Sequence, residues 1–348
     1  MRKLLTASTI KGILCCSIFA FHFLSNVKDG NTVERFFSRY GNSAVSCFFV
    51  LSGFLIWRNY IPISSVKRYI NMLTRRVWNV YPLHILTLLF CVAAFLLVKS
   101  PLAGRPTSVV KTLPSLALLH SFIPAQPEIR QCWNGVSWFL SALFFCWLAH
   151  PPIFNLIRKG KRLKTLICLI TLCYTVLISG TLFKFFSARE VIYFFPPTRF
   201  LEFTTGAMAG LIFQKKHLPV AVFFLIPAAL VSFAEPYAVG LFIAPWIALL
   251  ITFMCTPTRD KLCNTIPLKP FQLIGDLSFE FFMTHAIVLG IALAFVTKYA
   301  PNINRAISFL SILAVSVATA WLTHKVTTVF KKPHTASPTT PSAPASGK

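Results

Sequence analysis

The segment STIKGILCCSIFAFHFLSN, from Ser8 to Asn26, decides how this chain folds. It is apolar enough for a membrane helix, and two ionisable residues interrupt it: Lys11 near its start and His22 near its end. An ionisable group inside such a segment is costly and marks a functional candidate. Eleven residues of helix place His22 roughly 16 Å along the axis from Lys11. We therefore expect a basic group at one membrane surface and an imidazole well inside the bilayer.

Simpler interpretations of both residues stay open. A lysine near a helix end can extend its ammonium group to the membrane surface without any further role. A histidine inside a bundle can serve only as a hydrogen-bond donor between helices. The cost of burying His22 favours the functional interpretation.

The composition is that of a polytopic membrane protein. Of 348 residues, 55% are hydrophobic and 12% are charged, which is about half the usual charged fraction. The formal net charge of +25 would suggest nucleic-acid binding in a soluble protein. Here the basic residues fall mostly in short loops beside apolar spans, where they determine topology. We expect the lipid bilayer as the partner and no nucleic acid.

The chain is predicted to be all-α, because its apolar segments are long enough, or nearly so, to cross roughly 30 Å of hydrocarbon. Ten such segments are predicted at about 8–26, 41–58, 77–98, 136–155, 163–181, 196–214, 218–234, 238–255, 274–297 and 304–329. The pair 218–234 and 238–255 could instead form a re-entrant hairpin. No small-residue cleavage pattern follows the first segment, so we expect it to be retained.

Alternate loops differ in charge, which predicts the topology. Most lysines and arginines lie in one set of loops, and the positive-inside rule then places both termini in the cytoplasm and His22 in the outer half of the bilayer. Segment 99–135 is the sizeable external loop, and its prolines are expected to break regular structure. Residues 1–330 form the transmembrane domain, and 331–348 form a disordered cytoplasmic tail rich in Pro, Ser and Thr.

A second informative stretch runs from Asn42 to Pro82. It holds the sequence SCFFVLSGFLIW, in which Ser52-Gly53 lets two helices approach closely. A basic run follows and ends with Arg75 and Arg76 at the membrane edge. Guanidinium groups there could hold phosphates, although positive-inside charge explains either arginine equally well.

Other polar groups inside apolar segments have two interpretations each. Arg199 and Glu202 lie three residues apart, so they form either an ion pair or a substrate contact. Glu280 lies deeper than Asp276 on the same predicted segment and could orient His22 or line an acceptor path. Trp133 and Trp138 are interpreted as interface aromatics.

We interpret His285 as structural. No ligand-spaced cluster such as His-Glu-x-x-His is present, so no metal is expected.

Several motifs follow one another in a fixed order along the chain. They are Lys11 with His22; Phe48-Phe49-Val50-Leu51-Ser52-Gly53-Phe54-Leu55; Arg75-Arg76 ending at Pro82; Trp138-Phe139-Leu140-Ser141; Arg199-Phe200-Leu201-Glu202-Phe203 with Gly206 and Gly210; and Leu277-Ser278-Phe279 with His285. This ordered set resembles that of the integral-membrane acyltransferases of the acyltransferase-3 group, which acylate cell-surface glycans and related molecules. The resemblance covers the chain from about Lys11 to His285.

The resemblance implies a membrane O-acyltransferase that takes an acyl group, most simply acetyl, from cytoplasmic acyl-CoA. The acceptor would be a hydroxyl of a glycan or glycolipid at the outer half of the cell inner membrane, as in polysaccharide O-acetylation. His22 is the candidate base, because an imidazole accepts a hydroxyl proton near neutral pH. Arg75 and Arg76, with Lys11 secondary, are the candidates for binding coenzyme A phosphates. Glu202, Arg199 and Glu280 are the candidates for substrate contacts.

Three positions depart from the family's pattern: Lys11 replaces an arginine, Asn79 replaces the second arginine of an Arg-x-x-Arg pair, and Leu143 replaces a glutamate. Two other functions therefore remain open at this point. One is a transporter or flippase that moves a polar or lipid-linked solute, with His22, Glu202 and Glu280 as relay groups. The other is a catalytically silent member of a glycan-assembly complex.

Overall fold

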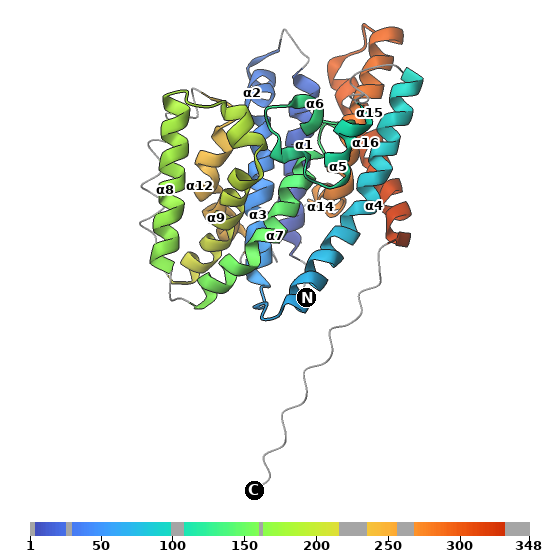
Figure 1. Cartoon of the computed structure of the whole chain (residues 1–348). Helices are drawn as coiled ribbons and strands as arrows, with labels where there is room; N and C mark the ends of the chain where they lie inside the picture. Colours follow the sequence, from blue (N-terminus) through green and yellow to red (C-terminus); the bar gives the residue numbers. More distant parts are fainter. Residues whose placement is uncertain are drawn as a thin grey trace.

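The computed structural model describes residues 4–25, 30–98, 108–159, 163–215, 235–255 and 268–330. Throughout these residues the regular structure is helical (Figure 1). Helix α1 (Leu5–Leu24) begins at the same end of the bundle at which α16 (Arg305–Phe330) finishes. An all-α fold, as the sequence predicts, is confirmed for the described part of the chain.

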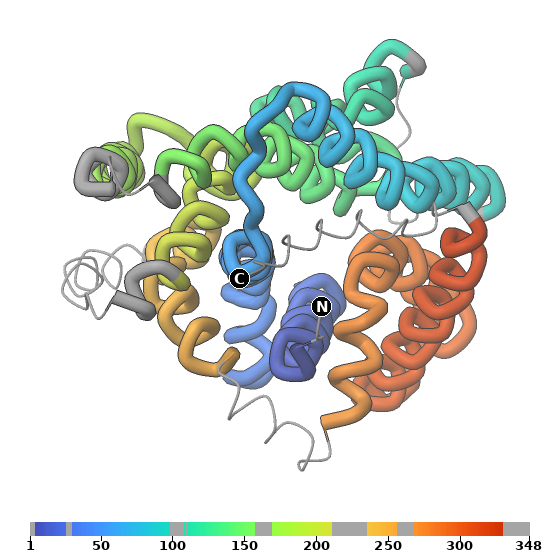
Figure 2. Tube along the Cα trace, turned by 90° about the horizontal axis from the view of Figure 1, so that it is seen from below, coloured from blue at the N-terminus to red at the C-terminus, as the bar shows by residue number. Residues whose placement is uncertain are grey.

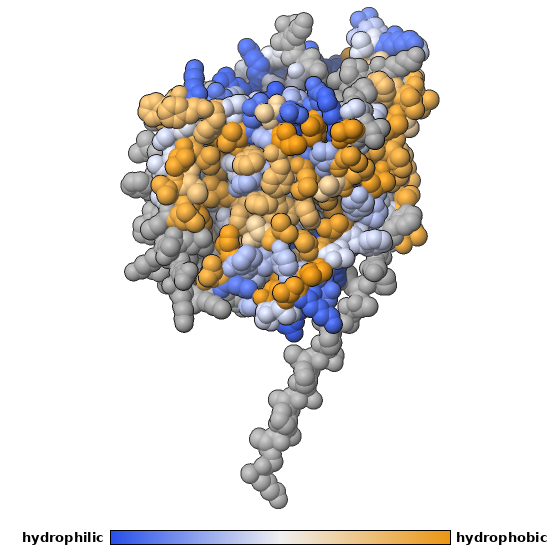
Figure 3. Space-filling model, viewed as in Figure 1, coloured by the Kyte–Doolittle hydropathy of each residue, from blue (hydrophilic) through white to orange (hydrophobic). Residues whose placement is uncertain are grey.

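Within the described residues, six helical segments are long and apolar enough to cross a membrane. They are Leu5–Leu24, Thr32–Arg58, Val66–Leu97, Trp138–Leu156, Ser278–Tyr299 and Arg305–Val329. Two shorter apolar stretches, Leu169–Leu182 and Val239–Met254, accompany them. Hydrophobic residues form a broad band across the middle of the surface, and hydrophilic residues gather at both ends (Figure 3). The chain is a multi-pass membrane protein.

Each predicted segment that falls on described residues overlaps a helix. The further helices concerned are α3 (Ala44–Arg58), α4 (Val66–Val98), α7 (Trp138–Lys159), α8 (Leu163–Leu182), α9 (Pro196–Lys215), α12 (Val239–Met254) and α15 (Ser278–Tyr299). The predicted segment 218–234 and the predicted tail 331–348 lie outside the described residues. The number ten and the cytoplasmic location of the termini stay predictions.

Two boundaries differ from expectation. Helix α4 begins at Val66, so the basic run preceding the predicted segment 77–98 is itself helical. The predicted segment 274–297 is divided at Leu277 into α14 (Lys269–Asp276) and α15. Asp276 and Glu280 therefore lie on different helices, and the prediction that they share one is wrong.

The expectation that prolines break segment 99–135 is partly wrong. The described part of this segment holds α5 (Val109–Leu116), the 3-10 turn η2 (His120–Phe122) and the short helix α6 (Pro127–Arg130). Pro127 occupies the first position of α6, where a fixed φ suits the helix and no backbone N–H is needed. Pro114 lies inside α5. A further short helix, α2 (Thr32–Tyr40), is held at its start by a capping box between Asn31 and Glu34.

Glycines set the closest helix contacts. A Cβ added at Gly53 would collide with the carbonyl oxygen of Phe203, and one at Gly206 would collide with that of Val50. Helices α3 and α9 therefore touch backbone to backbone, as small residues permit inside membranes. The close approach expected at Ser52-Gly53 is confirmed.

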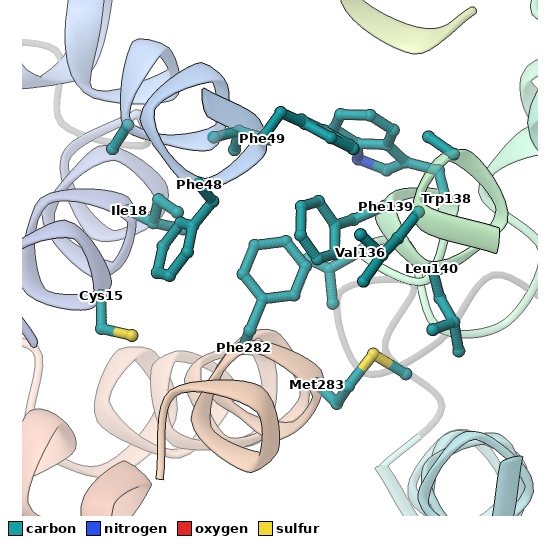
Figure 4. Packing of buried hydrophobic residues seen from close by; sticks show 14 of the residues in the cluster. Cys15, Ile18, Phe48, Phe49, Val136, Trp138, Phe139, Leu140, Phe282 and Met283 are labelled. Atoms are coloured by element: carbon teal, nitrogen blue, oxygen red, sulfur yellow. The ribbon is translucent and has the colours of Figure 1, made fainter. Parts of the chain in front are cut away.

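Helices α1 and α3 occupy the interior of the bundle, and α4, α7, α9, α12, α15 and α16 surround them (Figure 2). Phe48 of α3, Phe139 of α7 and Phe282 of α15 point toward one another in the core (Figure 4). Their ring centroids are 6.4 Å apart for Phe48 and Phe139, 6.4 Å for Phe48 and Phe282, and 4.7 Å for Phe139 and Phe282. We call these three residues the aromatic plug. Phe282 is also the point at which the plug meets the cavity described next.

Candidate active site

His22, in the last turn of α1, lines a cavity of about 370 Å³. The walls come from α1, α15, the chain entering α7, and a seven-residue π-helix, η3 (Ala188–Phe194). The amide of Asn134 donates a hydrogen bond of 2.9 Å to the carbonyl of Met283, which ties the segment before α7 to α15. The cavity therefore lies at the end of the bundle where α1 finishes.

His285 of α15 lies beside His22, with ring centroids 5.3 Å apart. Its Nδ1 is 2.8 Å from the carbonyl oxygen of Phe282 and 3.1 Å from that of Phe281. A carbonyl oxygen accepts, so Nδ1 carries the proton and Nε2 presents a lone pair. That buried Nε2 has no hydrogen-bond partner among the described residues. The structure thus gives His285 a fixed tautomer and an unused acceptor next to the candidate base.

An aromatic wall, formed by Trp138, Tyr193, Phe194 and Tyr237, lines the same cavity as His22. Ring centroids are 4.9 Å apart for Trp138 and Tyr193, 4.9 Å for Trp138 and Phe194, and 5.3 Å for Tyr193 and Tyr237. Such packing fixes the rings as a rigid surface. Trp138 is therefore a cavity residue, and its interpretation as a membrane-interface aromatic is wrong.

The π-helix η3 shapes this wall. In a π-helix each residue bonds to the fifth along, so residues four and five apart share a face, and such turns are rare and often mark functional sites. Arg189, Tyr193 and Phe194 have that spacing, and all three line the cavity.

Trp133 also lines the cavity, with a left-handed backbone conformation at φ 53°. That region is unfavourable for a large residue, at a cost on the order of 1–3 kcal/mol. The indole Nε1 donates to Thr112 Oγ1 at 3.3 Å. Trp133 is half-buried and its ring centroid lies 6.3 Å from that of Phe95, and its interpretation as an interface aromatic stays a prediction.

Arg199 and Glu202 form a buried ion pair. Arg199 Nη1 donates to both carboxylate oxygens, at 2.7 and 2.8 Å, and to Ser46 Oγ at 2.8 Å. Arg199 Nε donates to the carbonyl of Tyr193 at 2.6 Å, and the guanidinium lies 4.6 Å from the Tyr193 ring centroid. Neither side chain of the pair lines the cavity. The pair instead holds the end of η3 from behind.

The predicted donor-binding residues lie elsewhere. Arg75 is exposed and Arg76 half-buried in the early turns of α4, and the Arg76 guanidinium lies 5.6 Å from the Trp147 ring centroid. Lys11 lies in the first half of α1. These three residues belong to the end at which α1 and α4 begin (Figure 1), and none of them lines the cavity of His22.

Glu280, in the first turn of α15, is hydrogen-bonded to α16. Its carboxylate accepts from His324 Nδ1 at 2.8 Å, and it does not line the cavity. Across the described residues, no three side chains of His, Cys, Asp or Glu gather in a set suited to a metal ion.

A second pair of histidines, His84 of α4 and His120 of η2, holds the segment between α4 and α7 in place. His84 Nε2 bonds to the carbonyl of Ser115 at 3.0 Å, and His120 Nε2 lies 3.2 Å from Ser137 Oγ. Burial, together with the nearby His84, lowers the pKa of His120 to about 3. A neutral, stacked pair of this kind anchors α5 and η2 against α4 and α7.

The described part of the chain is a helical membrane bundle with one imidazole, that of His22, on a cavity lined by aromatic and polar side chains. The acyltransferase domain family matches residues 8–325, so the chain belongs to the acyltransferase-3 family of membrane acyltransferases. It is also similar to "Acyltransferase MdmB" of Streptomyces mycarofaciens, with 27% identity over 347 residues that cover 90% of this chain and 86% of that protein. No solved structure matches the chain. The family predicted from the motifs is confirmed, and so is the general class of acyltransferase; the acyl-CoA donor and the glycan acceptor stay predictions.

Proposed function

We propose that this protein transfers an acyl group, most simply acetyl, from cytoplasmic acyl-CoA to a hydroxyl of a cell-surface or lipid-linked glycan. The observation that carries the proposal is the position of His22 on the cavity, with His285 beside it. A half-buried imidazole that lines a space for substrate is what a general base requires. The family places the reaction among acyl transfers.

The residues of the cavity can perform the chemistry in balanced steps. His22 takes the proton of the acceptor hydroxyl while the hydroxyl oxygen attacks the thioester carbonyl. The tetrahedral intermediate collapses, the C–S bond breaks, and His22 returns the proton to the departing thiolate, which leaves as the free thiol of coenzyme A. The aromatic plug keeps bulk water away from the thioester. No metal is needed for these steps.

The donor enters from the opposite end of the bundle in this proposal. Arg75 and Arg76, with Lys11 secondary, bind the phosphates of coenzyme A, and the acyl-bearing arm extends toward His22. The span from Lys11 to His22 is roughly 16 Å, and the aromatic plug lies along it. We propose that Phe282 moves aside as the acyl arm arrives.

The proposed topology follows from charge. We place both termini in the cytoplasm, ten segments across the cell inner membrane, and the cavity toward the outside. Helix α1 begins and α16 ends at the same end of the bundle, which supports this arrangement. Residues 1–330 act as one transmembrane domain, and 331–348 form the tail.

The buried carboxylates support the acceptor site from a distance. We propose that Arg199 and Glu202 act by holding η3, and that Glu280 acts by fixing α15 through His324. The candidate substrate contacts thereby become positioning residues behind the wall.

The test is thiol release from acetyl-CoA by the purified protein in nanodiscs, with an alkyl glycoside added as the hydroxyl acceptor. Wild-type protein is expected to release coenzyme A, and His22→Ala is expected to release roughly 10² to 10⁴ times less. The Lys184→Gln variant, at an exposed position that does not line the cavity, serves as the matched control. Equal release by His22→Ala would remove it as the base, and solute flux without any release would favour a transporter.

A further inference from the structure

Positive charge surrounds the aromatic wall of the His22 cavity. Arg130 is buried, donates to the carbonyl of Pro124, and lies with its guanidinium 3.9 Å from the Phe194 ring centroid. Arg189 lies 5.3 Å from the Tyr237 centroid and 6.0 Å from that of Phe194. Arg199 supports Tyr193 from behind and is neutralised by Glu202. Two arginines besides Arg199, Arg130 and Arg189, therefore lie against the aromatic wall.

Arg189 is the charged side chain that reaches the cavity directly. The described residues that line the cavity include no aspartate or glutamate. Within the described residues, no carboxylate forms an ion pair with Arg189. It is exposed, so its guanidinium is available to a ligand that enters from the open end.

The remaining lining complements the flat faces of a sugar. Trp133, Trp138 and Tyr193 present aromatic surfaces, and Gln131 and Ser25 add polar groups at the same cavity. Ligand sites of this kind combine apolar and aromatic walls with a few polar groups that fix orientation. A volume of about 370 Å³ accommodates one or two sugar rings.

We infer that the acceptor is an acidic glycan, whose carboxylate or phosphate is bound by Arg189 while its sugar ring packs on the aromatic wall with a hydroxyl at His22. This inference rests on the proposed function and names its acceptor class. A guanidinium binds carboxylate or phosphate through two parallel hydrogen bonds. The π-helix places Arg189 and Tyr193 on one face, so these neighbouring side chains can bind the acidic group and the sugar ring of the same ligand.

The experiment measures binding in the absence of any acyl donor. The protein is held in nanodiscs of phosphatidylcholine, whose zwitterionic headgroups do not compete as anions. Three probes differ at one carbon: octyl glucoside, octyl glucuronide and octyl glucoside 6-phosphate. The proteins are wild type, Arg189→Gln, Arg189→Lys and the control Lys184→Gln, which removes a nearby exposed cation that does not line the cavity.

We expect wild type and Lys184→Gln to bind one acidic probe at least about tenfold more tightly than the neutral probe, which is roughly 1.4 kcal/mol. Arg189→Gln should abolish this preference and Arg189→Lys should keep part of it. The acidic probe that binds more tightly identifies the source as a uronic acid or a phosphorylated glycan. Equal affinities, an unchanged preference in Arg189→Gln, or no saturable binding of any probe would overturn the inference.

A failure of the proposed catalysis can be distinguished from a failure of the acidic-acceptor inference. His22→Ala should keep the wild-type preference for the acidic probe, even where its affinity for all three probes falls alike, because His22 contacts a hydroxyl that the probes share and not the acid. If the charge preference is found but thiol release does not depend on His22, the acceptor site stands and the proposed catalysis falls.

Discussion

The imidazoles of His22 and His285 lie 5.3 Å apart, centroid to centroid, on helices from opposite ends of the chain. The carbonyls of Phe281 and Phe282 fix the Nδ1 proton of His285, so its Nε2 faces away from α15 as an acceptor. A neighbour with a fixed tautomer can position a base and share its proton. We propose that the pair, and not His22 alone, is the unit on which the chemistry depends.

The first prediction concerns this neighbour. We expect His285→Phe to slow acyl transfer roughly tenfold to a hundredfold, toward the lower end of general-base effects, because His22 loses its partner. Donor KM should stay unchanged, and the pH–rate profile should shift. His285→Gln, which keeps a polar side chain, should retain more activity. An unchanged rate and profile in His285→Phe would show that the residue is only structural.

The second prediction concerns the ion pair behind η3. Arg199→Met leaves Glu202 buried without its partner, and such a loss costs about 3–5 kcal/mol. The double variant Arg199→Met with Glu202→Leu removes both charges and should be more stable than the single variant. Thermal unfolding in detergent checks this order. A single variant as stable as wild type would contradict the role assigned to the pair.

The third prediction concerns the contact between α3 and α9. Gly53→Ala and Gly206→Ala each bring a methyl group against a backbone carbonyl that cannot move aside. We expect both variants to express poorly or to unfold at markedly lower temperature. Gly135→Ala is the matched control, because a Cβ there meets nothing within 4 Å. Normal stability of Gly206→Ala would mean that the helices do not pack this closely.

The fourth prediction concerns the donor. Removing a charged hydrogen-bond donor costs about 1.5–3 kcal/mol, so Arg76→Ala should raise the KM for acetyl-CoA roughly tenfold or more with little change in kcat. Arg68→Ala, an exposed cation in the first turn of α4, is the control. Steady-state thiol release provides both constants. A fall in kcat at constant KM would place Arg76 away from the phosphates.

Much of the fold could be predicted from the sequence because hydrocarbon thickness sets helix length. The apolar spans around His22, Gly53 and His285 were visible as such, and so was the close packing that Gly53 permits. The ion pair of Arg199 and Glu202 was one of two interpretations that their spacing allowed.

The rest depended on three-dimensional contacts that spacing does not encode. His285 lies far from His22 in sequence, and only the packing of α15 against α1 brings the rings together. Arg189 sits in a π-helix, for which its sequence carries no periodic signal. The break at Leu277 was hidden because apolar residues continue through it. Trp138 belonged to a recognisable motif, yet its direction into the cavity follows from η3.

The most direct test of the account is chemical rescue of His22→Gly in nanodiscs, with transfer of radiolabelled acetyl from acetyl-CoA as the readout. We predict that transfer falls roughly 10² to 10⁴ times, in the range of a lost general base, and that added imidazole restores part of it. His285→Gly should show no comparable rescue. Transfer by His22→Gly within tenfold of wild type, without imidazole, would contradict the account.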